Sequence, residues 1–316
     1  MLTEHLRRGQ GDTTIPVIDY EGSGYQTDFW VGQGREYEDA AERRALAELV
    51  PPAGVRIAEI GAGFGRLGEL YQGYEQVILF DYSRTLLAEA AERWGHDPRF
   101  VFVAGNVYSL PLASGILDTL VMVRVMHHLA DVDAALAQLQ RVLHNRSVAV
   151  LEYANKRNLK ALMRWVLRRQ SWSPLDRAPV EFVDLNFDFH PAWMTARLAA
   201  AGLAPRKQYA VSHFRLPLLK DRVPARQLAA IDQRLFGVGG VYPLAPSVFV
   251  QVQPQVASAR RAVATTPDAV ADLLRCPNCG TDGLTRIADD VVECATCACH
   301  YGRRGSVWDM KEHLAT

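Results

Sequence analysis

Short apolar segments alternate with helical segments over residues 55–153, and this alternation restricts the fold more than any other feature of the chain. Five apolar runs are predicted as strands, at 55–60, 76–80, 100–103, 117–125 and 147–153. Helices are predicted between them at 83–94 and 131–143, the second with Asp131 as its N-cap. Strands that alternate with helices in this way form a mostly parallel sheet whose two faces are both covered.

The flanking segments extend this pattern. Residues 37–49 are predicted as a helix that a pair of prolines terminates. Residues 191–201 are predicted as another helix, with proline at its first position. Strand-like runs near 208–214 and 247–252 are expected to complete the sheet as an antiparallel pair. The predicted fold is therefore α/β, with a doubly wound, mostly parallel, seven-stranded sheet.

The first predicted strand runs into a glycine-rich turn, Glu59-Ile60-Gly61-Ala62-Gly63-Phe64-Gly65. Glycine allows a tight turn and a close approach to a ligand, and a helix that follows offers free amide groups. Asp81 comes 16 residues after Gly65 and directly follows the second strand. A carboxylate there can accept hydrogen bonds from both ribose hydroxyls of a dinucleotide or of S-adenosylmethionine (SAM).

Over about residues 37–254, the sequence resembles class I SAM-dependent methyltransferases. The matching stretches are, in order, residues 57–65, 79–81, 105–107 with 110–111, 117–118, 127–129 and 139–143. The resemblance implies that the glycine loop holds the methionine part of SAM, the methyl donor, and that Asp81 holds its ribose. It also implies that Asn106 and Val107 frame the adenine. The full set of cofactor-binding residues that we carry over is Glu59, Gly61, Ala62, Gly63, Gly65, Asp81, Tyr82, Asn106, Val107 and Arg124.

The chain departs from the family pattern at two places. Asn106 stands where the family usually has aspartate, and its amide oxygen can still accept from the adenine amino group. The usual Pro-Gly-Gly turn before the fifth strand is replaced by residues 144–147. The second change affects a loop rather than the predicted cofactor site.

His127 and His128 close the fourth predicted strand, at the edge where open α/β sheets bind ligands. One reading makes either of them a general base or a substrate contact. The other reading is that they only shape the cofactor pocket. Methyl transfer does not always need a base, because a sulfonium is a strongly activated donor and positioning of the acceptor can suffice.

All five cysteines lie between Cys276 and Cys299. Four of them form two Cys-x-x-Cys pairs, Cys276 with Cys279 and Cys294 with Cys297, with 14 residues between the pairs. This spacing is typical of a zinc ribbon, and four thiolates leave no open coordination position, so the predicted zinc is structural. The segment from residue 274 to residue 305 resembles the Trm112-like zinc module, whose members are partners or activators of methyltransferases.

A basic stretch follows the fifth predicted strand. Residues 156–169 contain six basic and no acidic residues, beside apolar positions at helical spacing. This stretch is interpreted as a lid over an anionic substrate, an RNA contact, a membrane-surface helix or a solvated face paired with acids.

The predicted domain organisation has four parts. They are a substrate-side segment (1–36), a methyltransferase domain (37–254) with a helical lid insertion (155–190), a linker (255–270) and a zinc ribbon (271–316). A charged N-terminus, the absence of an apolar run of about 20 residues and the clustered cysteines favour a cytoplasmic protein. We expect no transmembrane segment, and the oligomeric state stays open.

The main hypothesis is methyl transfer from SAM to a small-molecule or metabolite acceptor, at oxygen or carbon. Thirty-five basic residues balance thirty-five acidic ones, so no global field points to nucleic acid. The first 275 residues lack cysteine, which excludes a pyrimidine methyltransferase with a cysteine nucleophile. One alternative is an enzyme that modifies RNA or protein and uses the ribbon for docking. The other is a SAM-binding regulatory protein without turnover.

Overall fold

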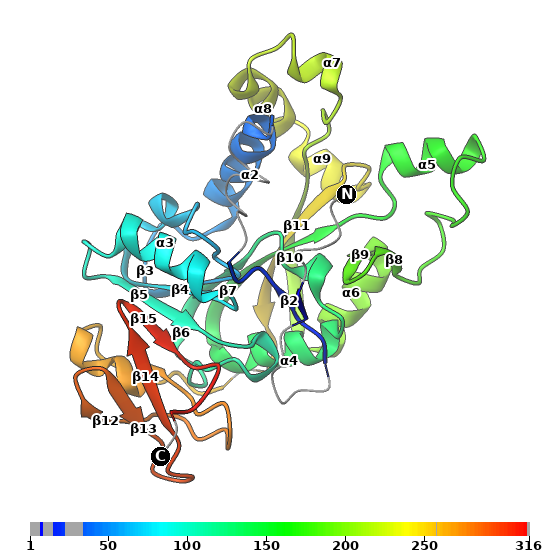
Figure 1. The fold of residues 1–316 in the computed structure, drawn as a ribbon. Coiled ribbons are helices and arrows are strands. Elements are labelled where there is room, and N and C mark those ends of the chain that lie inside the picture. The colour runs from blue at the N-terminus through cyan, green and yellow to red at the C-terminus, as the bar shows by residue number, and fades with distance from the viewer. Residues whose placement is uncertain (1–6, 9–14, 23–33, 257, 315–316) are drawn as a thin grey trace.

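One sheet runs through the molecule. The computed structural model describes residues 7–8, 15–22, 34–256 and 258–314, so most of the predicted segment 1–36 lies outside the described residues. The sheet has the strand order β10-β11-β7-β6-β3-β4-β5-β15-β14-β13-β12 (Figure 1). The N-terminal part of the chain forms a separate two-stranded sheet of β1 (Arg7–Arg8) and β2 (Ile18–Asp19).

The centre of the sheet follows the predicted alternation. Its parallel strands are β3 (Gly54–Ile60), β4 (Tyr74–Asp81), β5 (Phe100–Ala104), β6 (Leu117–Met122) and β7 (Leu143–Ala154). All five residues of β5 are buried, as expected for a strand with both faces covered. The expected antiparallel pair is present as β10 (Leu203–Val211) and β11 (Ser247–Pro254).

Helices cover the two faces and separate two apolar cores. One core contains residues of α2 (Glu36–Leu49), α3 (Arg84–Trp94) and α8 (Ala225–Gln233), and the other contains residues of α4 (Val132–Val142) and α6 (Pro191–Ala200). The predicted cap at Asp131 is confirmed, because its Oδ1 accepts a hydrogen bond from Ala134 N at 2.9 Å. Three short 3₁₀ turns lie in the connections: η1 (Gly68–Tyr71) between β3 and β4, η2 (Val107–Ser109) between β5 and β6, and η3 (Met126–His128) between β6 and α4.

The prediction of seven strands is wrong, because the sheet has eleven. The C-terminal strands β12 (Thr285–Ala288), β13 (Val291–Glu293), β14 (His300–Arg304) and β15 (Val307–Asp309) join the seven-stranded part at its edge. β15 runs parallel to β5, with Val307 opposite Phe102 and Asp309 opposite Ala104. An edge strand leaves backbone groups unpaired, and β15 satisfies those of β5. The C-terminal part is therefore continuous with the sheet.

The segment expected to be a linker is hydrogen-bonded to the main sheet. The guanidinium of Arg56, which is buried, donates to the carbonyls of Val263 and Ala264 at 3.1 and 3.3 Å. Beyond it, η4 (Pro267–Ala269) and α10 (Val270–Leu273) lead into the cysteine-containing segment. Ala113 N donates to Leu273 O at 2.8 Å, which fixes the end of this connection to the loop between β5 and β6.

The segment 155–190 is only partly helical. The helix α5 (Leu159–Val166) begins after Asn158, whose Oδ1 accepts from Ala161 N, and it covers eight residues of the basic stretch 156–169. Arg168 follows in the left-handed region at φ 55°, where a helix ends. The rest of the segment forms a hairpin of β8 (Val180–Val183) and β9 (Asn186–Asp188).

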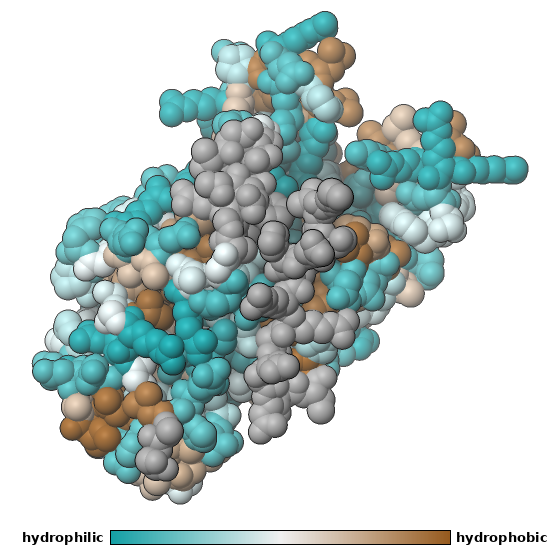
Figure 2. Space-filling view, viewed as in Figure 1, coloured by the Kyte–Doolittle hydropathy of each residue, from teal (hydrophilic) through white to brown (hydrophobic). Residues whose placement is uncertain are grey.

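Three short helices connect β10 to β11. They are α7 (Pro217–Lys220), α8 and α9 (Phe236–Val241), and they lie above the sheet with α5 to their side (Figure 1). Hydrophobic atoms reach the surface in this region of the space-filling view (Figure 2). Within the described ranges, no helix combines the length and the apolar composition that a bilayer-crossing segment needs.

Candidate cofactor site and cysteine cluster

A cavity of about 740 Å³, counted with its opening to solvent, lies at the carboxyl ends of β3, β4, β5 and β6. Ligands bind at this edge in open α/β sheets. Six of the ten predicted cofactor-binding residues line the cavity: Gly61, Gly63, Asp81, Tyr82, Val107 and Arg124. A smaller cavity beside the glycine loop is lined by Glu59 and Ala62, together with Arg66 and Arg124.

The glycine loop has a backbone that other residues adopt only with strain. Gly61, Gly63 and Gly65 have φ values of 77°, 53° and 71°. A Cβ on Gly61 would also lie 2.1 Å from Cγ2 of Val125. Gly65 does not line either cavity, and its carbonyl accepts a hydrogen bond from the indole of Trp94 at 2.8 Å. Its role in the structure is therefore to let α3 pack against the loop.

Asp81 connects the loop to the end of β4. Its Oδ2 accepts from Gly63 N at 2.7 Å, and its Oδ1 accepts from Ser83 N at 2.9 Å. Burial raises the pKa of Asp81, although these backbone donors oppose the shift. A carboxylate has about four acceptor positions, so both oxygens can still accept from ligand hydroxyls.

The end of β5 supplies the opposite wall of the cavity. Gly105, Val107 and Tyr108 line the cavity there. Asn106 does not, and its Oδ1 accepts a hydrogen bond from Tyr108 N at 2.9 Å, which caps the turn η2. The role in adenine recognition that we carried over to Asn106 stays a prediction.

Arg124 has a strained backbone. It follows β6 at φ 60°, which is unusual for a side chain of this size. Its backbone N donates to Oε2 of Glu152 at 2.8 Å, and its guanidinium donates to Oε1 of Glu42 at 2.5 Å. Burial alone would raise the pKa of Glu42, but Arg124 and Arg66 lower it. No sequence pattern points to Glu42 or Glu152, because both lie inside ordinary helix and strand patterns.

His128 lines the cavity as a neutral imidazole. Burial lowers its pKa to about 4. Its Nδ1 lies 3.2 Å from Leu185 O, and its Nε2 lies 3.4 Å from the hydroxyl of Tyr20. Because a carbonyl only accepts, Nδ1 carries the proton and Nε2 accepts from Tyr20.

His127 packs against His128. The two imidazole centroids are 3.9 Å apart. Burial is the main cause that lowers the pKa of His127, and the neighbouring His128 lowers it further. Its Nδ1 is buried without a hydrogen-bond partner among the described residues. Of the two histidines, His128 is the one that lines the main cavity.

Residues 15–22, which we call the N-terminal strap, lie over the cavity. Val17, Ile18 and Tyr20 of the strap line it. The carboxylate of Glu21 accepts from Arg84 N and Thr85 N at 2.8 and 3.2 Å, at the start of α3. A carboxylate is favourable at a helix N-terminus, so this contact holds the strap in place.

The chain after β15 contacts the N-terminal strap and Tyr82, which both line the cavity. Nζ of Lys311 lies 3.7 Å from the ring centroid of Tyr82, and 3.9 and 4.0 Å from carboxylate oxygens of Asp19 and Glu21. Arg84 also pairs with Asp309 at 2.8 Å. The sequence did not predict these contacts, because Lys311 is far from the glycine loop in the chain.

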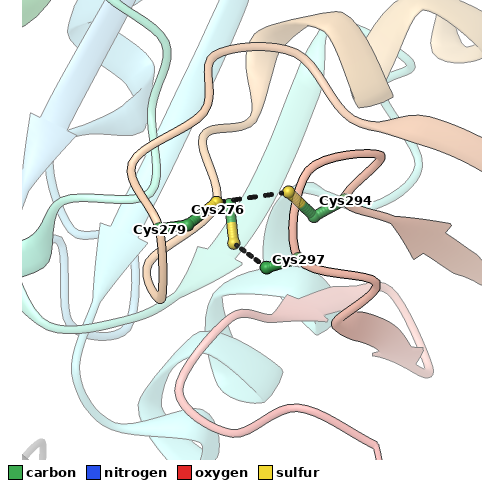
Figure 3. A group of neighbouring side chains, drawn as sticks. All are labelled: Cys276, Cys279, Cys294 and Cys297. Atoms are coloured by element: carbon green, nitrogen blue, oxygen red, sulfur yellow. Dashed lines mark hydrogen bonds between the residues drawn. The ribbon is translucent and has the colours of Figure 1, made fainter.

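The four cysteines of the two Cys-x-x-Cys pairs come together, as the sequence predicts (Figure 3). Their Sγ atoms all lie within 4.8 Å of one another, and the closest pairs are 3.4 and 3.5 Å apart. Zinc–sulfur bonds of about 2.3 Å place the thiolates of a tetrahedral site about 3.8 Å apart, so this arrangement suits zinc. Cys299 stays outside this set and accepts from Asn278 Nδ2 at 3.4 Å.

Comparison with known proteins finds a domain-family match and a short stretch of sequence similarity. Residues 58–151 match the model of a methyltransferase domain family. The chain is 32% identical over 83 residues to an uncharacterized 37.1 kDa protein of transposon TN4556 from Streptomyces fradiae. That match covers 26% of this chain and only 24% of the relative.

Two solved structures share the fold at low sequence identity. One is a chain from the complex of the Haloferax volcanii Trm112 methyltransferase activator with a methyltransferase, with a TM-score of 0.51, 16% identity and coverage of 73% of this chain and 96% of that one. The other is a SAM-dependent methyltransferase from Thermotoga maritima, with a TM-score of 0.50, 15% identity and coverage of 74% and 97%.

Residues 58–151 therefore match a methyltransferase domain family, and the two solved structures show that the chain shares their fold. The family match ends at residue 151, well before the cysteines. The resemblance of the C-terminal segment to a Trm112-like module therefore stays a prediction.

Proposed function

We propose that this chain transfers a methyl group from SAM to a small organic acceptor at oxygen or carbon. The observation that carries the proposal is the cavity in which the glycine loop, Asp81, Arg124 and His128 converge beneath the N-terminal strap. When bound, SAM supplies a methyl group activated by a sulfonium. A pocket of this kind can hold the acceptor in line with the methyl group.

The residues of the cavity suit the parts of SAM. Asp81 offers acceptor positions for ribose hydroxyls, and Val107 with Tyr108 offers an apolar and aromatic wall for the adenine. In the adjoining small cavity, Glu59 would face an ammonium group, and Arg66 and Arg124 would face a carboxylate. These are the two charged groups of the methionine part.

Positioning is the main contribution that we assign to His128. A pKa of about 4 makes Nε2 a weak base, although it is unprotonated at neutral pH. It can orient an acceptor through Tyr20 or take a proton from an acidic hydroxyl. Proton removal from a weakly acidic acceptor would need a stronger base than His128, and His127 is not one, because burial and the neighbouring His128 lower its pKa too.

The four clustered cysteines hold a structural zinc ion in this proposal. Four thiolates close the coordination sphere, so the ion would take no part in methyl transfer. The Haloferax volcanii structure contains a separate activator beside a methyltransferase. We assign a comparable supporting role to the C-terminal strands of this chain, because β15 extends the edge at β5 and Lys311 contacts Tyr82.

Calorimetry with SAM tests the cofactor assignment. Asp81→Ala should abolish measurable binding, whereas Asp268→Ala, which removes an exposed carboxylate of η4, should bind like the parent. Equal binding by Asp81→Ala and the parent would refute the assignment.

Incubation with methyl-labelled SAM and fractionated cell extract tests the acceptor class. Label should appear in a small-molecule fraction. Label on RNA or protein instead would favour a macromolecular acceptor, and tight SAM binding without any labelled product would favour a regulatory protein.

A further inference from the structure

The helix α5 turns its apolar side to solvent. Leu159, Met163, Val166 and Leu167 follow the spacing of one helix face, and each leaves more than half of its surface exposed. Val166 alone is 70% exposed. Ala161 is the one buried residue of α5. An apolar helix face normally packs on a core, so this face is available for a partner.

Basic side chains flank the apolar face. Lys160, Arg164, Arg168 and Arg169 are exposed, and no acidic residue occurs between positions 155 and 169. Lys156 does not belong to this group, because its Nζ donates to Ala178 O at 2.5 Å and lies over the Trp172 ring. Lys156 instead anchors the segment that follows α5.

A second exposed apolar group lies next to α5. Leu159 N donates to Leu244 O at 2.8 Å, which connects the start of α5 to the chain after α9. Val238, Val241 and Tyr242 on that side are each more than 70% exposed. We call the exposed apolar and basic residues of α5, with these three residues, the α5–α9 rim. Hydrophilic and hydrophobic atoms lie side by side over α5 in the space-filling view (Figure 2).

We propose that the α5–α9 rim docks on the surface of an anionic lipid bilayer. Amphipathic helices with Lys and Arg beside an apolar face bury that face at the acyl boundary and place their cations among anionic headgroups. In this protein, basic side chains that complement anionic headgroups and exposed apolar side chains occur together on α5.

Other partners use only part of this surface. RNA would engage the arginines through phosphates but would leave Met163, Val166 and Leu167 in water. A second copy of the chain could cover the apolar face, but it would bring two sets of like charges together. An anionic bilayer would contact both the basic side chains and the apolar face.

The rim lies at the same end of the parallel strands as the cavity. α5 follows the carboxyl end of β7, and the cavity lies at the carboxyl ends of the strands parallel to β7. Docking would therefore bring the cavity side of the sheet toward the membrane. The docking proposal does not depend on the proposed methyl transfer.

Cosedimentation of the full chain with vesicles tests the proposal. The probes are vesicles of phosphatidylcholine alone and vesicles with an added phosphatidylglycerol fraction. The parent should bind the anionic vesicles at least tenfold more tightly, and the double variant Val166→Glu/Leu167→Glu should lose at least tenfold in affinity. Each of Arg164→Glu and Arg168→Glu should weaken binding about fivefold or more, with a smaller effect in high salt.

Matched controls place the same changes elsewhere. Ile287→Glu alters a half-exposed apolar residue of β12, and Arg206→Glu alters an exposed arginine of β10. Both should bind vesicles like the parent. Because all of the altered side chains are exposed, the circular dichroism spectra and melting temperatures should match the parent, which separates loss of docking from loss of folding.

Three results would overturn the proposal. The first is equal binding to both kinds of vesicle, and the second is unchanged binding by Val166→Glu/Leu167→Glu. The third is α5-dependent binding of RNA, or self-association abolished by the same double variant, in the absence of vesicle binding.

Discussion

At the scale of single residues, the interior near the glycine loop holds an unusual carboxyl group. Glu59 is the penultimate residue of the apolar strand β3 and is almost completely buried, with its Oε2 accepting from the hydroxyl of Tyr71 at 3.0 Å. Burial raises the pKa of Glu59 to about 7. The folded protein therefore holds a proton on Glu59 at pH values where the unfolded chain has released it.

This difference predicts a pH-dependent stability. Between about pH 4.5 and 7 the folded state binds more protons than the unfolded state, so the contribution of Glu59 to the free energy of unfolding falls as the pH rises. Above about pH 7 it is constant. Glu59→Gln should remove this slope and raise the free energy of unfolding at pH 8 by up to about 3 kcal/mol, measured by urea denaturation.

Glu312→Gln, which alters a largely exposed carboxyl, is the matched control. It should keep the pH slope of the parent. If Glu59→Gln and Glu312→Gln gave the same slope, Glu59 would be ionised in the fold and the assignment would be wrong.

At the scale of elements, the N-terminal strap and the end of the C-terminal strands hold one wall of the cavity together. Lys311 is the common contact, because its ammonium group lies over Tyr82 and beside Asp19 and Glu21. Its side chain is only 8% exposed, so solvent screens these interactions little.

Lys311→Met should therefore weaken SAM binding about fivefold, as expected for the loss of about 1 kcal/mol from a cation–π contact and two ion pairs. Calorimetry measures this change directly. Lys311→Arg keeps the charge and should bind SAM within about twofold of the parent. An unaltered affinity of Lys311→Met would mean that the strap and Tyr82 are held by other contacts.

At the scale of the whole molecule, the cysteine segment and the methyltransferase-like part share a sheet and a core. Cys276, Cys294 and Trp308 belong to the same apolar cluster as Leu136 and Leu198, which lie on α4 and α6. Melting of the C-terminal strands would expose the edge of β5 and open this cluster. The two parts are therefore expected to unfold together.

Zinc removal tests this coupling. The purified chain should contain about one zinc per molecule by elemental analysis, and Cys276→Ser or Cys294→Ser should abolish it. Chelation should lower the melting temperature of one cooperative transition by at least about 5 °C, because structural zinc contributes folding free energy.

Cys299→Ser is the control for zinc content, because Cys299 lies outside the four clustered thiols. It should retain the metal. A separate small transition on chelation, with the main transition unmoved, would contradict the coupling of the two parts.

Much of the fold could be predicted from the sequence because its signals are local. Apolar runs between helical segments specify the parallel strands, and Asp131 marks a helix start through its own side-chain chemistry. The tight glycine turn and the place of Asp81 at the end of β4 follow from local sequence for the same reason. The two Cys-x-x-Cys pairs predicted their own convergence, since each pair presents two thiols from one turn.

The tertiary structure alone decided the features that depend on distant partners. The pairing of β15 with β5 brings residue 309 beside residue 104, and no local pattern specifies which edge a strand will extend. The same holds for Lys311 beside Tyr82. For α5, the sequence pattern predicted an amphipathic helix but not that its apolar face points to solvent. Periodicity defines which residues share a face, whereas the packing of the whole chain determines what that face meets.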